Sequence, residues 1–259
     1  MSNVRHTQAL AACGLLLTAL IWGFAFVVVK NSLDLIPPIY MLAFRFTIAS
    51  AALALILFRR LRRITRRDLQ SGAILGVFLF AAYALQTIGI YVILVPFLHW
   101  LINRRRPDRY VIGGALLAMV GIGLLSLQGE GGIALGDLLT LLCGIFFAVH
   151  IVYIDRYTLA QDPAILTVLQ LATAAVLSFL LAPLIDGPFP AQALHPEAVT
   201  GMLYLGLLST MLGFLLQNVG QKYTTPSTAS LLLPFESVFG VLFSTLFLHE
   251  AMTARMLLG

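Results

Sequence analysis

Two charged side chains lie inside long apolar stretches of this 259-residue chain, where an ionised group needs a partner or water. Arg45 falls near the middle of Ile36–Phe58, and Glu236 follows Pro234 by two residues within Ala229–Leu248. An arginine at the centre of a bilayer-spanning helix costs about 2.5–3.5 kcal/mol on insertion scales, so Arg45 is expected to face protein groups or a water-filled cavity. It either contacts an anionic substrate or a counter-ion, or it forms an internal pair or caps the carbonyls of a broken helix. Glu236 is its candidate partner.

Glu236 itself has three possible uses. Carboxyl groups inside membranes take part in proton relays, and they also form structural hydrogen bonds or contact a substrate. Pro234 lacks a backbone N–H and is expected to distort the helix just before this carboxyl. The sequence leaves the three uses open.

Amide and aromatic side chains in the apolar runs are the other candidates for binding a small molecule. Gln86, Gln217 and Asn218 must find hydrogen-bond partners, either in neighbouring helices, at about 0.6 kcal/mol per contact on average, or in a ligand. Aromatic rings either line a cavity suited to amphipathic or cationic solutes or face lipid; the rings concerned are those of Trp22, Tyr83, Tyr91 and Tyr153. The predicted substrate-cavity residues are Trp22, Arg45, Tyr83, Gln86, His150, Tyr153, Gln217 and Glu236.

Motifs of enzymes, metal sites and ATP-driven pumps are absent from the sequence. It contains no Walker A loop, no His-Glu-x-x-His, no Gly-x-Ser-x-Gly and no cysteine pair at zinc spacing. His99 and His150 are 51 positions apart with no second ligand at metal spacing, and Cys13 and Cys143 each lie in an apolar run as packing residues. We therefore expect no cofactor, no metal ion and no catalytic residue.

The composition indicates how these residues are positioned. Apolar residues make up 60% of the chain and charged residues 10%, whereas an ordinary soluble chain is roughly 25% charged. Such a chain cannot cover a folded surface with polar groups, and disorder, a disulfide scaffold and a nucleic-acid-binding domain are excluded on the same grounds. The prediction is an all-α polytopic membrane bundle.

A helix that crosses a bilayer needs about 20 mostly apolar residues. The runs that meet this criterion are Ala9–Val29, Ile36–Phe58, Gly72–Ile102, Tyr110–Leu127, Asp137–Ile154, Ala164–Leu184, Thr200–Gly220 and Ala229–Leu248. The third has 31 residues, about 46 Å of helix, and is interpreted as two short or re-entrant passes. About nine spans are therefore expected, with polar loops such as Arg59–Gln70 and Ile185–Val199 between them.

Arginine clusters predict the orientation in the membrane. They consist of Arg59, Arg60, Arg62, Arg63, Arg66 and Arg67 in one loop and Arg104, Arg105, Arg106 and Arg109 in another. Cytoplasmic loops carry the excess of Lys and Arg, so both clusters and the N-terminus are expected in the cytoplasm. Two passes between the clusters also leave Gly129–Gly136 and Ile185–Val199, which contain no Lys or Arg, outside.

The two halves of the chain resemble each other. Leu85–Tyr91 recurs as Leu216–Tyr223, and two shorter motifs recur in the same order: Val95–Phe97 as Leu233–Phe235 and Arg109–Gly113 as Arg255–Gly259. The first copy runs from inside to outside and the second from outside to inside, which is typical of secondary transporters built from inverted repeats. The predicted repeats are residues 1–128 and 129–259. The first is shorter between its third and fourth helices, and the second lacks a counterpart of the helix Gly114–Leu127.

The chain resembles the EamA-type transporters of the drug/metabolite transporter superfamily along essentially its whole length. The residues that carry the resemblance are Trp22-Gly23-Phe24, Val29-Lys30, Arg45-Phe46, Gly136-Asp137-Leu138-Leu139, Leu216-Gln217, Pro234-Phe235-Glu236-Ser237-Val238-Phe239 and His249-Glu250. The resemblance implies two inverted repeats of up to five helices, a central cavity, and transport of small metabolites across a prokaryotic inner membrane.

The sequence thus predicts a secondary transporter that works by alternating access, with a small-molecule substrate and the lipid bilayer as partners. One alternative is a truncated or internally shortened family member that inserts but does not cycle. The other is a membrane-embedded enzyme using Glu236, His150 or Arg45. A homodimer is not decided by the sequence, since the close-packing face formed by Gly72 and Gly76 is interpreted as contact within the chain.

Overall fold

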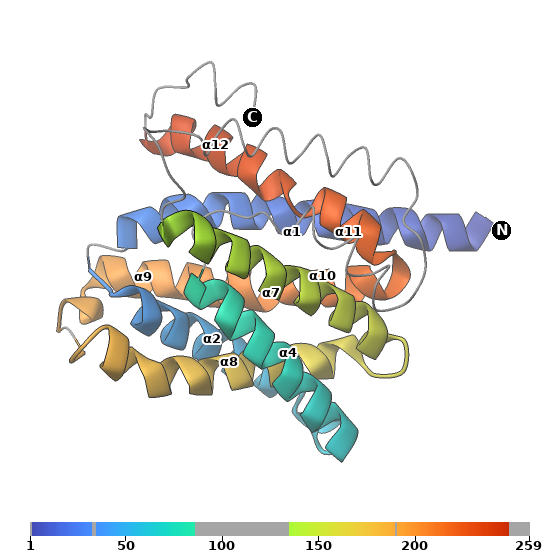
Figure 1. Cartoon of the computed structure of the whole chain (residues 1–259). Helices are drawn as coiled ribbons and strands as arrows, with labels where there is room; N and C mark the ends of the chain where they lie inside the picture. Colours follow the sequence, from blue (N-terminus) through green and yellow to red (C-terminus); the bar gives the residue numbers. More distant parts are fainter. Residues whose placement is uncertain (1, 33–34, 86–134, 190, 249–259) are drawn as a thin grey trace.

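The computed structural model describes residues 2–32, 35–85, 135–189 and 191–248, and within these ranges the regular elements are all helices (Figure 1). The helices are α1 (Ser2–Ser32), α2 (Pro38–Ile56), α3 (Phe58–Leu61), α4 (Arg66–Leu85), α7 (Leu135–Thr158), α8 (Pro163–Ile185), the 3₁₀ turn η1 (Ala191–Leu194), α9 (Pro196–Leu203), the π-helical segment η2 (Tyr204–Leu212), α10 (Gly213–Tyr223), α11 (Pro226–Leu232) and α12 (Phe235–Leu248). The expected span Tyr110–Leu127, the second part of Gly72–Ile102, and Gln86, Tyr91 and His99 lie outside the described residues.

Several of these helices are long enough to cross a membrane. Among the described residues, six segments are both long and apolar enough: His6–Val29, Pro38–Ile56, Arg66–Leu85, Pro163–Ile185, Pro196–Tyr223 and Pro226–Leu248. Each overlaps a span expected from the sequence, and α7 overlaps a further one. The prediction of an all-α polytopic membrane bundle is confirmed.

The polar stretch 59–70 contains more helix than the sequence analysis expected. It holds α3 and the first turn of α4, which begins at Arg66. Thr65 and Asp68 form a reciprocal capping box: the backbone N–H of Thr65 donates to Asp68 Oδ2 at 3.0 Å, and the N–H of Asp68 donates to Thr65 Oγ1 at 3.2 Å. Because these backbone donors are satisfied locally, the helix can begin among charged residues. Hydropathy alone does not detect such a helix start.

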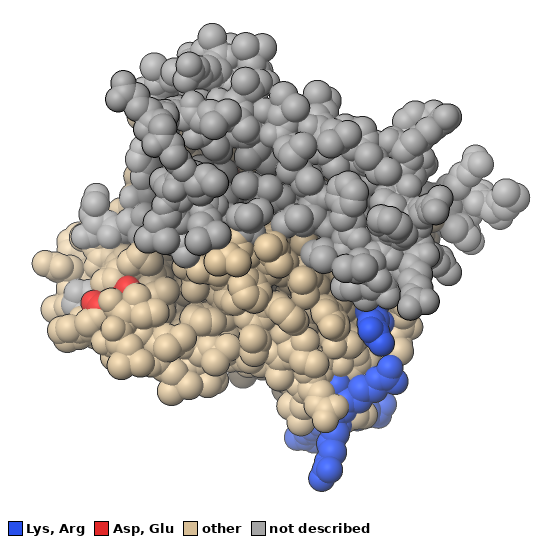
Figure 2. All heavy atoms as spheres, in the orientation of Figure 1, with Lys and Arg blue, Asp and Glu red and all other residues tan. Residues whose placement is uncertain are grey.

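Basic residues gather at one end of the bundle. Figure 2 shows Lys and Arg at the end where α2 finishes and α4 begins. We name this the arginine end; its side chains, all exposed, are those of Arg59, Arg60, Arg62, Arg63, Arg66 and Arg67. The opposite end, where α2 begins and α8 finishes, carries Asp186 and is named the Asp186 end.

A carboxylate ties the beginning of α2 to the end of α8. The N–H groups of Ile39 and Tyr40 donate to Asp186 Oδ2 at 2.7 and 2.9 Å, and the Tyr40 hydroxyl donates to the carbonyl of Gly187 at 3.1 Å. Gly187 has a φ of 77° just after the helix, a conformation that glycine adopts without steric cost. Asp186, at the end of the neighbouring helix α8, therefore caps the beginning of α2.

Replacing Asp186 by alanine is expected to destabilise the protein by about 1–2 kcal/mol, the usual cost of losing an N-cap side chain. The measurement is the midpoint of thermal unfolding in detergent. Asp186→Asn keeps one acceptor oxygen and is expected to lose less. An unchanged midpoint for the alanine variant would show that this cap contributes nothing to stability.

Close helix contacts depend on glycine. A Cβ at Gly72 would meet the Leu169 side chain, and a Cβ at Gly76 would meet the Thr173 side chain and approach the Gln170 carbonyl oxygen to 2.6 Å. These neighbours belong to α8, so the Gly72 and Gly76 face packs within the chain, as the sequence analysis interpreted it. The main core lies among α1, α2, α7, α8 and α10, and its fully buried side chains include Leu15, Phe46, Ile151, Leu171 and Phe214.

Candidate functional site

A cavity of about 400 Å³ lies between α1, α2, α4, η2 and α12. It extends from Trp22 and Arg45, in the interior of their helices, to Val29 and Pro38 near the Asp186 end. Its walls are formed by Trp22, Ala25, Phe26, Val29, Pro38, Ile39, Met41, Leu42, Arg45, Tyr83, Ala84, Ser209 and Glu236. Mostly apolar walls with a few polar groups, at this volume, are typical of a small-molecule site.

Arg45 places a buried cation on the cavity wall. Its side chain is 5% exposed; Nε donates to Thr210 Oγ1 at 2.9 Å, and Nη2 donates to Ser209 Oγ at 3.1 Å. The guanidinium carbon lies 4.9 Å from the centre of the Tyr83 ring, a cation–π distance. A guanidinium carries five N–H donors, so these two bonds do not exhaust it. Neutral groups thus hold Arg45 without requiring the Glu236 carboxylate.

Ser209 and Thr210 are site residues that the sequence analysis missed. They lie in η2, where the wider π-helical turn replaces the α-helical one for nine residues. The same segment presents the carbonyl of Ser209 to Trp22, whose indole Nε1–H donates to it at 2.8 Å. The signal that could have identified them is a pair of hydroxyls inside the apolar run 200–220, because buried hydroxyls need partners.

Glu236 follows a break between two helices. The N–H of Glu236 donates to the carbonyl of Leu233, and that of Ser237 donates to the carbonyl of Pro234, both at 2.9 Å and both one residue shorter than the α-helical spacing. The distortion expected from Pro234 is confirmed. Glu236 lies in the first turn of α12, is 8% exposed and lines the cavity.

A second, much smaller chamber of about 10 Å³ adjoins the cavity. Its walls are formed by Trp22, Tyr83, Phe147, Ile151, Gln217, Leu233 and Glu236. Trp22, Tyr83 and Glu236 therefore belong to both spaces. Gln217, expected at the substrate cavity, borders the small chamber instead.

Two other candidates lie on α7, away from the cavity. His150 is fully buried, and its Nε2 is 3.0 Å from Gln170 Oε1 on α8. Tyr153 stacks on Phe78, with ring centres 5.7 Å apart, and also contacts Tyr157. The structure thus brings Trp22, Arg45, Tyr83 and Glu236 together at one cavity, while His150 and Tyr153 pack between helices.

The fold and the cavity define a multi-pass helical membrane protein with a solute-sized space between its helices. The chain belongs to the EamA-like transporter family, which matches residues 9–93 and 134–259. The resemblance inferred from the sequence is confirmed.

Similar proteins support the same assignment. A protein of Archaeoglobus fulgidus named "Uncharacterized transporter" is 32% identical over 257 residues, covering 94% of this chain and 80% of that protein. The Bacillus subtilis protein named "Uncharacterized transporter YoaV" is 24% identical, covering 95% of this chain and 91% of that protein. A solved crystal structure matches 96% of this chain and 91% of its own with a TM-score of 0.78 at 18% identity, which supports the fold alone.

Proposed function

We propose that this protein is a secondary transporter that moves a small metabolite or amphiphilic compound across a prokaryotic inner membrane by alternating access. The observation that carries the proposal is the 400 Å³ cavity with a buried arginine and a buried glutamate on otherwise mostly apolar walls. Secondary transporters bind their substrates near the middle of the membrane, the depth expected for Arg45 at the inner end of this cavity, and next to interrupted helices like the one that ends before Glu236.

The orientation follows from the charges. Cytoplasmic loops are rich in Lys and Arg, so the arginine end faces the cytoplasm and the Asp186 end faces outward. The first span, α1, ends at the Asp186 end. The N-terminus, at the other end of this span, is then cytoplasmic. The cavity occupies the outer half of the bundle, which corresponds to a state that receives or releases substrate outside. We further propose that residues 1–128 and 129–259 form two inverted repeats whose relative movement exposes the cavity to either side.

The chemistry of the walls favours an amphiphile with an anionic group. Arg45 offers N–H donors to a carboxylate or phosphate, and Trp22, Phe26 and Met41 offer apolar contact to the rest of the molecule. Glu236 suits a second, cationic or hydrogen-donating group. The two charged groups therefore fix the orientation of the solute, while the apolar walls contact the rest of it.

Counterflow in reconstituted vesicles tests the proposal without knowledge of the coupling ion. Vesicles preloaded with an unlabelled metabolite should accumulate the labelled form when the metabolite is a substrate, and a panel of anionic, zwitterionic and cationic amphiphiles identifies the class. Binding is followed by fluorescence in a Trp100→Phe variant, where Trp22, on the cavity wall, is the remaining tryptophan. Transported solutes should change its emission saturably. Binding without counterflow for any solute would favour the alternative of a family member that does not cycle.

A further inference from the structure

Buried polar atoms without partners gather between three helices on the arginine-end side of the small chamber. They are His150 Nδ1 on α7, Gln170 Nε2 on α8, and Gln217 Oε1, Asn218 Oδ1 and Gln221 Oε1 on α10. The five side chains are between 0% and 2% exposed. We name these five residues the polar seam.

Four of the five side chains of the polar seam, those of His150, Gln170, Asn218 and Gln221, form one hydrogen bond each through one of their two polar atoms. His150 Nε2 pairs with Gln170 Oε1 at 3.0 Å, Asn218 Nδ2 donates to Thr167 Oγ1 at 2.8 Å, and Gln221 Nε2 donates to the Ile151 carbonyl at 3.2 Å. These bonds tie α7 to α8, α8 to α10 and α10 to α7. The opposite ends of the same groups remain unpaired, so direct contacts between these helices do not satisfy them.

Water is a molecule suited to completing these contacts. An unmade hydrogen bond on a buried polar atom costs about 1–3 kcal/mol, and nearly all such atoms in native proteins are paired with protein or with ordered water. The polar seam contains a donor, Gln170 Nε2, and three acceptor oxygens. A buried water typically makes about three hydrogen bonds and both donates and accepts, so it serves both kinds of atom.

The small chamber can hold one water molecule next to Gln217 of the polar seam. Its volume of about 10 Å³ approaches what one water molecule needs. Gln217, Tyr83 and Glu236 line it, so a water there has several polar partners. Such a water connects the polar seam with the carboxyl group of Glu236, which also lines the 400 Å³ cavity.

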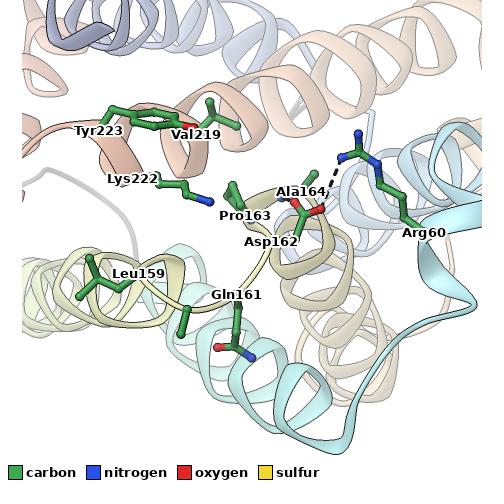
Figure 3. Close-up of a pocket in the computed structure, with 10 residues that line it drawn as sticks. Arg60, Leu159, Gln161, Asp162, Pro163, Ala164, Val219, Lys222 and Tyr223 are labelled. Atoms are coloured by element: carbon green, nitrogen blue, oxygen red, sulfur yellow. Dashed lines mark hydrogen bonds and ion pairs between the residues drawn. The ribbon is translucent and has the colours of Figure 1, made fainter. Parts of the chain in front are cut away.

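Next to Gln221, at the other end of the polar seam, a hollow lies at the arginine end (Figure 3). This vestibule has a volume of about 510 Å³ and lies between α3, the beginning of α8 and the end of α10. Lys222, the neighbour of Gln221, lines it, as do Asp162 and Arg60, whose ion pair at 3.4 Å is drawn there. Gln217 and Gln221 are one turn apart, about 6 Å along α10, a gap that one or two waters can bridge.

We propose that water molecules fill the polar seam and connect Glu236 with the vestibule as a path for protons. The protonated carboxyl of Glu236 gives its proton to the chamber water. The hydronium formed passes a proton to the next water, and the vestibule releases it, leaving a carboxylate at Glu236. A proton from water in the 400 Å³ cavity, which Glu236 also lines, reloads the carboxylate, so that protons pass from the cavity to the vestibule. The assignment of the vestibule to the cytoplasm and of the cavity to the outside rests on the proposed function.

Other ionisable groups surround the path. Arg45 of α2 lines the central cavity with Glu236, and Tyr83 of α4 and Cys143 of α7 lie within electrostatic reach of its carboxyl. His150 belongs to the polar seam itself. Gly23 of α1, which does not titrate, packs so closely that a Cβ added there would lie 3.0 Å from the carbonyl oxygen of Glu236. These groups influence the charge on Glu236, but none of them interrupts the path to the vestibule.

Proton flux into vesicles tests the path in the absence of any transported solute. Reconstituted protein with a pH-sensitive dye inside is given an inside-negative potassium diffusion potential with valinomycin. The wild type should acidify the lumen faster than protein-free vesicles. Gln217→Leu should slow this flux by about tenfold, the effect of losing roughly one hydrogen bond from the path. Gln217→Ser, which leaves a hydroxyl and room for another water, should restore part of it.

Matched variants separate this effect from damage to the fold. Thr245→Val removes a hydroxyl that bonds only within α12, to the Val241 carbonyl, and should leave proton flux unchanged. Asn218→Leu tests the path a second time should Gln217→Leu fail to yield folded protein. Wild-type flux no greater than that of empty vesicles, or equal flux in wild type and both leucine variants, overturns the proposal. Normal counterflow without proton flux overturns the path alone, whereas proton flux without counterflow overturns the transport proposal alone.

Discussion

Arg45→Ala is expected to shift counterflow of anionic substrates to much higher solute concentrations while the protein remains folded. A hydrogen bond to a charged group contributes about 1.5–3 kcal/mol, so removing the guanidinium should weaken solute binding by about 10- to 100-fold. The hydroxyls of Ser209 and Thr210 that held the guanidinium can turn to carbonyls of their own helix, which limits the structural damage. The measurement is the concentration dependence of counterflow, with Trp22 fluorescence reporting binding.

Two further substitutions separate charge from shape. Arg45→Gln keeps hydrogen-bond donors near the two hydroxyls but removes the charge, and it should bind anionic solutes nearly as weakly as the alanine variant. Arg45→Lys keeps the charge without the planar donor fork and should fall between glutamine and the wild type. Should all three variants transport with wild-type affinity, Arg45 would be a purely structural residue, the alternative that the sequence left open.

Gly76→Val is expected to prevent stable folding. Even the Cβ of this side chain meets Thr173 on α8 and the Gln170 carbonyl oxygen at 2.6 Å, and neither can move without shifting the backbone. Overpacking of a close contact typically costs 1–3 kcal/mol, and a branched side chain against backbone is at the upper limit of about 3 kcal/mol or beyond. The yield of monodisperse protein and its unfolding midpoint in detergent measure the loss.

Gly14 provides the matched control. It also lies inside a helix, but an added Cβ there has nothing within 4 Å. Gly14→Ala should leave stability unchanged or raise it by up to about 1 kcal/mol, since alanine is the better helix former. A Gly76→Val protein as stable as Gly14→Ala would show that the contact between α4 and α8 can relax, contrary to its geometry.

Much of the fold followed from residue types read along the chain. The described helices overlap the apolar runs because burial in lipid depends on the summed hydropathy of about 20 consecutive residues, a property of local sequence. The break at Pro234 was equally local, since proline lacks an N–H whatever surrounds it. The start of α4 was missed because a capping box between Thr65 and Asp68 outweighs the polarity of the first turn.

The cavity needed information that no single segment contains. Arg45 and Glu236 are recognisable from the sequence as charges in apolar runs, but which residues face them depends on how each helix is rotated and paired. His150 and Tyr153 also lie in an apolar run, yet they pack between helices, against Gln170 and Phe78 respectively. Composition and hydropathy do not encode that rotation.

The sequence by itself determined that this chain is a helical membrane protein, where most of its spans lie, and to which transporter family it belongs, because each of these depends on residue type and order. The tertiary structure alone decided that Arg45 bonds to hydroxyls 164 and 165 positions away, and that Gln217 faces a water-sized chamber rather than the substrate cavity. Hydrogen bonds act over about 3 Å, so they depend on which helices meet and in what register.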